Sequence, residues 1–235
     1  MWKRRVVIAV VALLLGAGAL WPAHKSRTFQ FFGEIVARVE TDRKVVALTF
    51  DDGPIPGRTE EILGILRELS VPATFFVTGR ELEEHMTQGK QLVAGGHELG
   101  NHSYSHARTL ALRSVEAFGA EIERTDALIR EAGYQGEIHF RPPYGKKLFT
   151  GPWYLSRTGR KTITWDVEPE SYPEVAVSAE RIAGHVQQNA RPGSIILLHV
   201  MYGSRAESVR AVRPIVEGLR AEGYRFVTVS ELLAR

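Results

Sequence analysis

The amino-acid sequence predicts an α/β domain with a mainly parallel sheet. From Lys44 onward, short apolar runs rich in β-type residues alternate with longer segments whose apolar residues recur at helical spacing. This alternation is typical of parallel sheets, because a parallel connection is usually made by a helix. With 235 residues, 44% of them hydrophobic, the chain has the length for one such domain and a short extension.

Seven runs are expected to form strands. They are residues 45–50, 73–77, 97–99, 138–140, 162–165, 194–198 and 225–229. Two helical faces lie between them, formed by Ile62, Ile65, Leu66 and Leu69 and by Val209, Val212, Ile215, Val216 and Leu219. Gly-Tyr pairs at 133–134 and 223–224 are expected to end two helices.

Residues 1–24 are predicted to be a signal peptide or a signal anchor. Three cations at positions 3–5 precede an apolar run at 6–21. The run is short for a membrane span, which needs about 20 apolar residues, and residues 17–19 form a small-residue cleavage site, so cleavage and retention both stay open. A buried core helix is less favoured, since the cations suit a membrane surface better. We therefore expect an extracytoplasmic protein, secreted or attached to the membrane through residues 6–21.

Residues 25–42 are interpreted as a linker with room for one added strand or helix, and residues 43–235 as the folded domain. Without residues 1–24, the 30 lysines and arginines fall to 27, which equals the 27 aspartates and glutamates. A formally neutral domain gives no electrostatic reason to expect a nucleic-acid partner. The chain has no cysteine. This excludes disulfides, a lipid-modified cysteine and thiolate ligands, so any metal must be bound by His, Asp or Glu.

Side chains capable of chemistry follow most of the expected strands. They are Asp51 and Asp52, Asn101 and His102, Arg141, Asp166, and His199. The carboxyl ends of parallel strands converge on one face of a barrel or open sheet, where active sites form. These side chains are therefore expected to lie close together.

The first candidate group is a metal site. Asp51 and Asp52 are adjacent carboxylates that point in different directions and so can take two roles, although the run at 51–54 is by itself a turn signal. His102 and His106, four residues apart, would share one face of a helical turn, although such a pair is often coincidental. With Asp52 they supply two nitrogen ligands and one oxygen ligand and leave a position for water, as in catalytic zinc sites.

The second candidate group would act on the substrate. Arg141 opens a loop that two prolines stiffen, and it is expected to hold Asp51 in a bidentate pair. The backbone amide of Tyr144 is expected to face a developing oxyanion. His199, with an ordinary pKa of about 6.5, is suited to protonate a leaving group. A bare loop and a core or rim histidine are the structural alternatives, and Trp165 is interpreted as core or pocket wall. The residues alone indicate metal-assisted hydrolysis.

Five motifs occur in the order found in the polysaccharide deacetylases, the NodB-homology family or carbohydrate esterase family 4. They are TFDDGP at 49–54, HSYSH at 102–106, RPPYG at 141–145, WD at 165–166 and LLH at 197–199. The chain resembles this family over residues 44–233. The resemblance implies a distorted (β/α) barrel of about seven parallel strands, with residues 43–235 as the catalytic domain. It also implies hydrolysis of the acetamide of N-acetylglucosamine units in peptidoglycan, chitin-type oligomers or exopolysaccharide, with release of acetate.

The resemblance also assigns roles. Asp51 would be the general base, and one divalent ion, zinc first and cobalt or another ion as alternatives, would be bound by Asp52, His102 and His106. No organic cofactor is expected.

The remaining roles follow the same pattern. Arg141 would orient Asp51, the Tyr144 amide would stabilise the oxyanion, and His199 would protonate the departing amine.

The fourth motif departs from the family pattern, in which an acidic residue supports the histidine. Alignment from Trp165 makes Glu168 its counterpart, whereas Asp166 lies closer to the strand end, so both remain candidates.

Two other functions remain open. One is a carbohydrate-binding or wall-associated protein that has lost turnover, against which the complete set of ligands, base and acid argues. The other is a hydrolase of a different amide or an ester at the same metal. The expected partner is a polysaccharide or oligosaccharide substrate, and the expected state is a monomer.

Overall fold

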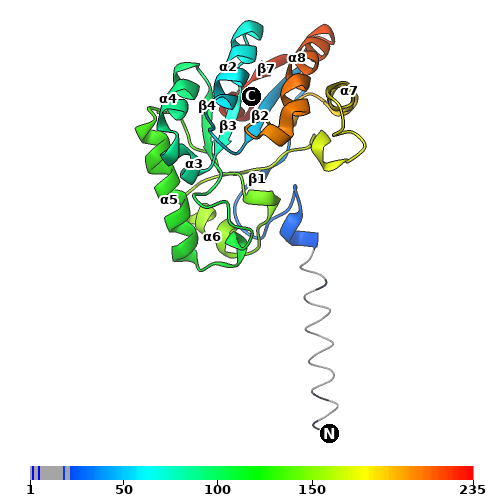
Figure 1. Cartoon of the computed structure of the whole chain (residues 1–235). Coiled ribbons are helices and arrows are strands. Elements are labelled where there is room, and N and C mark those ends of the chain that lie inside the picture. Colours follow the sequence, from blue (N-terminus) through cyan, green and yellow to red (C-terminus); the bar gives the residue numbers. More distant parts are fainter. Residues whose placement is uncertain (1, 3–4, 6–17, 19–21, 235) are drawn as a thin grey trace.

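Parallel strands form the centre of the domain in the computed structural model (Figure 1), which describes residues 2, 5, 18 and 22–234. β2 (Val45–Asp51) is buried along its whole length and pairs in parallel with β3 (Thr74–Val77) on one side and β6 (Ile195–His199) on the other. β7 (Arg225–Val227) pairs with the start of β2, and β4 (Glu98–Asn101) with β3. Strands of a parallel sheet covered on both faces are expected to be mainly apolar, as β2 is from Val45 to Leu48.

The remaining strands form a second, smaller sheet. β1 (Ile35–Val36) and β5 (Thr162–Ile163) form a second parallel pair. Isolated parallel bridges join Asn101 to Phe140, Phe140 to Thr162 and Val167 to Ile196. These bridges link β4 to β5 through Phe140, and Val167, four residues after β5, to β6, an arrangement compatible with the expected distorted parallel barrel.

The prediction of a strand at 138–140 is wrong in extent. Only Phe140 of this run takes part in pairing. The amide of Arg141 still donates to Asn101, but Pro142 and Pro143 have no amide hydrogen, so the ladder cannot continue. The seventh strand among the described residues is β1 instead, the added strand for which the interpretation of residues 25–42 left room.

Helices surround the strands (Figure 1). They are α2 (Arg58–Leu69), α3 (Gly79–Glu84), α4 (Met86–Ala94), α5 (Val115–Glu131), α6 (Thr150–Arg157), α7 (Ala179–Asn189), α8 (Ala206–Ala221) and α9 (Val229–Leu233). The apolar face predicted for α8 is buried throughout, and that of α2 is buried except for Ile65, which is half-buried. Gly133 and Gly223 follow α5 and α8 with positive φ angles of 98° and 88°, the left-handed conformation that ends helices.

The segment from residue 24 to 42 lies against the domain. The amide of Lys147 donates to the carbonyl of His24, and the hydroxyl of Thr164 donates to that of Arg27 over 2.6 Å. Further along, the amide of Val39 donates to Gly193.

The predicted signal segment falls mainly outside the described residues, which include only positions 2, 5, 18 and 22–24 of it. Within the described part of the chain, no helix combines the length and the apolar character that crossing a bilayer requires.

Candidate active site

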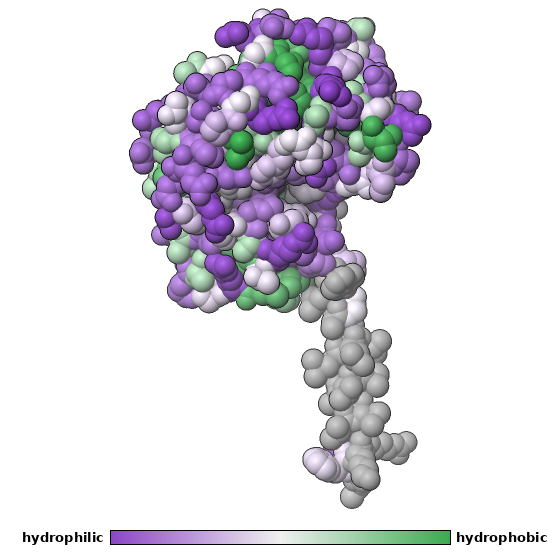
Figure 2. Space-filling view, in the orientation of Figure 1, coloured by the Kyte–Doolittle hydropathy of each residue, from purple (hydrophilic) through white to green (hydrophobic). Residues whose placement is uncertain are grey.

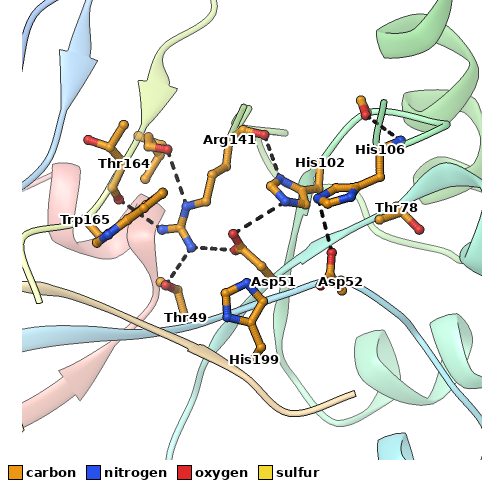
Figure 3. A network of polar contacts seen from close by, with 12 residues as sticks. Thr49, Asp51, Asp52, Thr78, His102, His106, Arg141, Thr164, Trp165 and His199 are labelled. Carbon is orange, nitrogen blue, oxygen red and sulfur yellow. Dashed lines mark hydrogen bonds and ion pairs between the residues drawn. The ribbon is translucent and has the colours of Figure 1, made fainter. Parts of the chain in front are cut away.

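The predicted site residues converge at the carboxyl ends of the strands, as Figure 3 shows. Asp51 ends β2, and His199 ends β6 beside it, since these two residues are register partners. With His102, His106 and Trp165 they line a pocket of about 710 Å³. The expectation that strand ends bring these side chains together is confirmed for Asp51, Asp52, His102, Arg141 and His199, but not for Asn101 and Asp166, whose side chains bind elsewhere.

Asp52, His102 and His106 form a possible metal site. One donor atom from each lies within 4.8 Å of the others. Oδ1 of Asp52 is buried and accepts no hydrogen bond within the described structure, and it lies 3.5 Å from Nε2 of His106. A buried carboxylate oxygen without a donor costs free energy unless a cation satisfies it. This orphaned oxygen beside two imidazoles therefore fits a bound divalent ion.

The protonation states suit metal binding. Burial lowers the pKa of His102 to about 3, which keeps its imidazole neutral. Its Nδ1 lies 2.8 Å from the carbonyl oxygen of Arg141, which can only accept, so Nδ1 carries the hydrogen and Nε2 keeps a free lone pair. Burial raises the pKa of Asp52 to about 7, with Asp51 and Glu81 adding to the shift and His199 and Arg205 opposing it. A nearby cation would reverse that cost of ionisation.

The two histidines meet in a loop, so the expectation of a helical turn is wrong. Their ring centroids lie 4.9 Å apart. The side chain of Asn101 accepts from the amide of Ser103, and the Ser103 hydroxyl accepts from the amide of His106. These local bonds offer the backbone an alternative to helix. They hold Ser103 and His106 at φ angles of 65° and 51°.

Arg141 anchors Asp51 from inside the protein. Its side chain is completely buried, and Nη1 donates to Oδ1 of Asp51 over 2.7 Å. Burial raises the pKa of Asp51, but the charges of Arg141, His102 and His199 outweigh it and keep the pKa below its ordinary value. Asp51 is therefore ionised at neutral pH.

The Arg141–Asp51 contact is single, so the expected bidentate pair is wrong. Nη1 also donates to the hydroxyl of Thr49, while Nε and Nη2 donate to the carbonyls of Ile163 and Thr164. The other donors of the guanidinium therefore bind backbone carbonyls at the end of β5 and just after it, which gives these buried acceptors a partner.

Neither acidic residue proposed to support His199 contacts it. Asp166 accepts from the hydroxyl of Ser194 and the amide of Ile195, and so joins two strand segments. Glu168 lines the pocket, where its Oε2 accepts from Nε1 of Trp165 over 2.9 Å and from Arg27 over 2.6 Å.

Glu170, which the sequence analysis missed, holds His199. Its Oε2 lies 2.5 Å from Nδ1 of His199, and its Oε1 accepts from the His199 amide and the Ser208 hydroxyl. Glu170 follows Pro169 in the short 3₁₀ turn η3 (Pro169–Ser171), which turns its side chain back to the end of β6. The signal that could have identified Glu170 is its position directly after Pro169, because the fixed φ of proline favours a turn that separates Glu170 from Glu168.

This contact prepares His199 to hold a proton. Burial lowers the pKa of His199, but the hydrogen bond and charge of Glu170, with the charges of Asp51 and Asp52, raise it to about 9. Because the carboxylate accepts from Nδ1, the remaining nitrogen, Nε2, is the one available to the pocket.

Tyr144 lies on the rim of the pocket. It is 40% exposed, and its ring centroid is 4.6 Å from that of His106. It has a left-handed φ of 58°, and of the five non-glycine residues described with positive φ, four are in this site: Asp52, Ser103, His106 and Tyr144. Such strained residues concentrate where function requires a fixed geometry.

Comparisons with known proteins point to one family. The family description "Polysaccharide deacetylase" matches residues 38–163. A peptidoglycan-N-acetylglucosamine deacetylase of Bacillus cereus is 34% identical over 205 residues, which cover 86% of this chain and 93% of that protein. A chitooligosaccharide deacetylase of Azorhizobium caulinodans is 34% identical, covering 80% and 94%. The crystal structure of the Bc1960 peptidoglycan N-acetylglucosamine deacetylase superposes with a TM-score of 0.77 at 33% identity, covering 83% of this chain and 91% of that one.

Proposed function

Because the chain belongs to the polysaccharide deacetylase family, we propose that it hydrolyses the N-acetyl group of N-acetylglucosamine units in a polysaccharide and releases acetate. The observation that carries this proposal is the grouping of the Asp52, His102 and His106 donor atoms within 4.8 Å, in one pocket with Asp51 and His199. A metal site flanked by a base and an acid has the parts that amide hydrolysis needs.

The metal site is proposed to hold zinc. Two imidazoles and one carboxylate suit Zn²⁺ better than the oxygen-preferring Mg²⁺ or Ca²⁺, with Co²⁺ as a close alternative. When an ion is bound there, the chemistry that it supplies is activation of water and polarisation of the acetyl carbonyl.

The protein's own groups then have two proton-transfer tasks. Asp51, kept ionised by Arg141, accepts a proton from the attacking water. His199, whose pKa Glu170 helps to raise, donates a proton from Nε2 to the departing amine. The amide of Tyr144 is proposed as a hydrogen-bond donor to the oxyanion, because the stiff left-handed turn fixes its direction in advance.

The test is acetate release by the full chain from N-acetylglucosamine oligomers and from peptidoglycan, with zinc and with a chelator. Asp51→Asn serves as the matched variant. Release should require the metal and should fall about 10²- to 10⁴-fold in the variant, the range of general-base contributions. A folded, zinc-loaded protein that releases no acetate would support the silent binding protein, or a hydrolase of another amide or ester.

Among the possible polymers, the charges favour one that carries carboxylates, as peptidoglycan does. Lys25 and Arg205 line the pocket, and Arg108 lies over the ring of Tyr144 at 4.7 Å. None of these three makes an ion pair with a described carboxylate, whereas Glu168 is paired with Arg27. These three cations are therefore available to a carboxylate of the substrate, which positive charge attracts.

A peptide-free peptidoglycan tetrasaccharide and its methyl ester differ in carboxylate charge alone. We expect higher kcat/KM for the charged form. Lys25→Gln and Arg205→Gln should each reduce this preference by about two- to fivefold at low salt. Lys90→Gln, an exposed lysine of α4 outside the pocket, is the control. Equal rates on both forms would contradict the assignment of the polymer but not the reaction.

We also propose that the protein acts outside the cytoplasm, where such polymers lie, and acts as a monomer. The apolar run at 6–21 supports export or attachment. Cell fractionation followed by N-terminal sequencing would separate a cleaved signal from a retained anchor, and sedimentation would give the oligomeric state.

A further inference from the structure

Five aromatic side chains form an exposed cluster away from the pocket. They are Phe29, Phe31, Phe32, Phe149 and Trp153, called here the aromatic patch, and each is 38–48% exposed. The rings make two sets of contacts. Phe31 packs against Phe149 and Phe29 with centroid distances of 4.6 Å and 5.2 Å, and Phe32 packs against Trp153 at 5.2 Å.

The patch is built by two separate parts of the chain. Residues 29–32 follow the N-terminal region, whereas Trp153 belongs to α6 and Phe149 immediately precedes it. Gly33 keeps the two parts close, because a Cβ at this position would lie 3.1 Å from that of Ser156. A single exposed apolar side chain is ordinary, but contiguous exposed rings on a fixed surface indicate a contact site.

The N-terminal part of the aromatic patch lies close along the chain to the N-terminal apolar run. The apolar run ends at Trp21, eight residues before Phe29, and eight residues span at most about 29 Å when fully extended. In Figure 1, α6 lies at the same end of the domain as the N-terminal segment. In Figure 2, hydrophobic residues are exposed at this lower end, close to where the grey N-terminal part begins.

We propose that the aromatic patch docks on the surface of a lipid bilayer. Aromatic side chains, tryptophan above all, favour the membrane–water interface, where a ring is buried at little polar cost. Arg157, an exposed residue at the end of α6, makes no ion pair with a described carboxylate and would face anionic headgroups. Docking would place the pocket close to the membrane surface, within reach of glycan near the bilayer.

The experiment measures contact between Trp153 and lipid. The full chain carries four tryptophans, and a Trp2→Phe, Trp21→Phe background leaves Trp153 and the buried Trp165. This protein is bound to vesicles of phosphatidylethanolamine and phosphatidylglycerol, with or without bromine on the acyl chains. We expect the brominated lipid to quench the emission of Trp153.

Two double variants sharpen the test. In that background, Phe31→Ser with Phe149→Ser should lose the quenching and keep acetate release from soluble oligomers. Leu112→Ser with Val177→Ser, which removes exposed apolar side chains elsewhere, should keep both. Circular dichroism checks that each variant is folded. If a variant does not fold, the quenching of Trp153 in the protein with the intact patch still tests the proposal.

Three outcomes would overturn the proposal. They are an unquenched Trp153 in protein that floats with the vesicles, protein that does not bind vesicles, and a dimer that the Phe31→Ser, Phe149→Ser change dissociates, since a second copy would then cover the patch. The readout does not depend on acetate release, so this proposal and the proposed function can fail separately.

Discussion

The two sides of the pocket are built in different ways. On the metal side, Asp52, His102 and His106 come from two short motifs, and local bonds within residues 101–106 set the loop. On the acid side, His199, Glu170 and Ser208 come from three distant segments and meet through side-chain contacts. The metal side therefore depends on fixed spacing in the sequence, whereas the acid side needs only that some carboxylate reach Nδ1 of His199.

The largest effect is expected on the metal side. His102→Ala removes a buried imidazole that we propose as a metal ligand and leaves only Asp52 and His106 to bind the ion. Activity should fall at least about a thousandfold, because the metal supplies several kcal/mol of transition-state stabilisation. Metal content by mass spectrometry should fall with it. A variant that keeps full metal content and activity would contradict the ligand assignment.

A smaller effect, of another kind, is expected on the acid side. Glu170→Gln removes the negative charge that helps to raise the pKa of His199 to about 9. The pKa should fall, so His199 loses its proton at lower pH and the basic limb of the kcat profile moves to lower pH. We expect kcat to fall about 10- to 100-fold, as for other residues that orient a functional histidine.

Glu168→Gln is the matched control for Glu170, since it changes the same residue type two positions away. Glu168 contacts Trp165 and Arg27 but not His199. The loss of the Glu168 charge should raise KM no more than about fivefold, because a partly exposed ion pair contributes little free energy. A shifted basic limb in this variant would show that Glu168, and not Glu170, tunes the histidine.

The smallest effect on catalysis is expected at Asp166. Asp166→Asn keeps one oxygen that can accept from Ser194 or Ile195, so activity should be unchanged. Stability should fall by about 1 kcal/mol, the value of one weakened hydrogen bond, and urea unfolding would measure it. A loss of activity without a loss of stability would return Asp166 to the catalytic group.

The fold was predictable wherever a pattern repeats over several residues. The apolar residues of α8 repeat at helical spacing because one face of the helix is buried, and β2 appears as a nearly continuous apolar run because both of its faces are buried. The two-residue strands β1 and β5 carry no such period. Their pairing arises from the arrangement of neighbouring segments.

By itself, the sequence determined the chemistry of the metal side. The types and order of Asp51, Asp52, His102 and His106 limit the site to oxygen and nitrogen ligands beside a base, since no cysteine is present. It also determined that Asp51, Asp52 and His102 lie at or just after strand ends, because strand ends follow from the apolar runs. The resemblance of the motifs to the polysaccharide deacetylases depended on the same residues.

Only the tertiary structure decided which carboxylate serves His199 and how Arg141 is used. Glu168 and Glu170 are the same residue type two positions apart, and a 3₁₀ turn selects between them. Arg141 could have made two bonds to Asp51, but the carbonyls of Ile163 and Thr164 take its other donors. A hydrogen bond between distant segments requires a donor–acceptor distance correct to a few tenths of an ångström and a suitable angle. Spacing along the chain does not encode either.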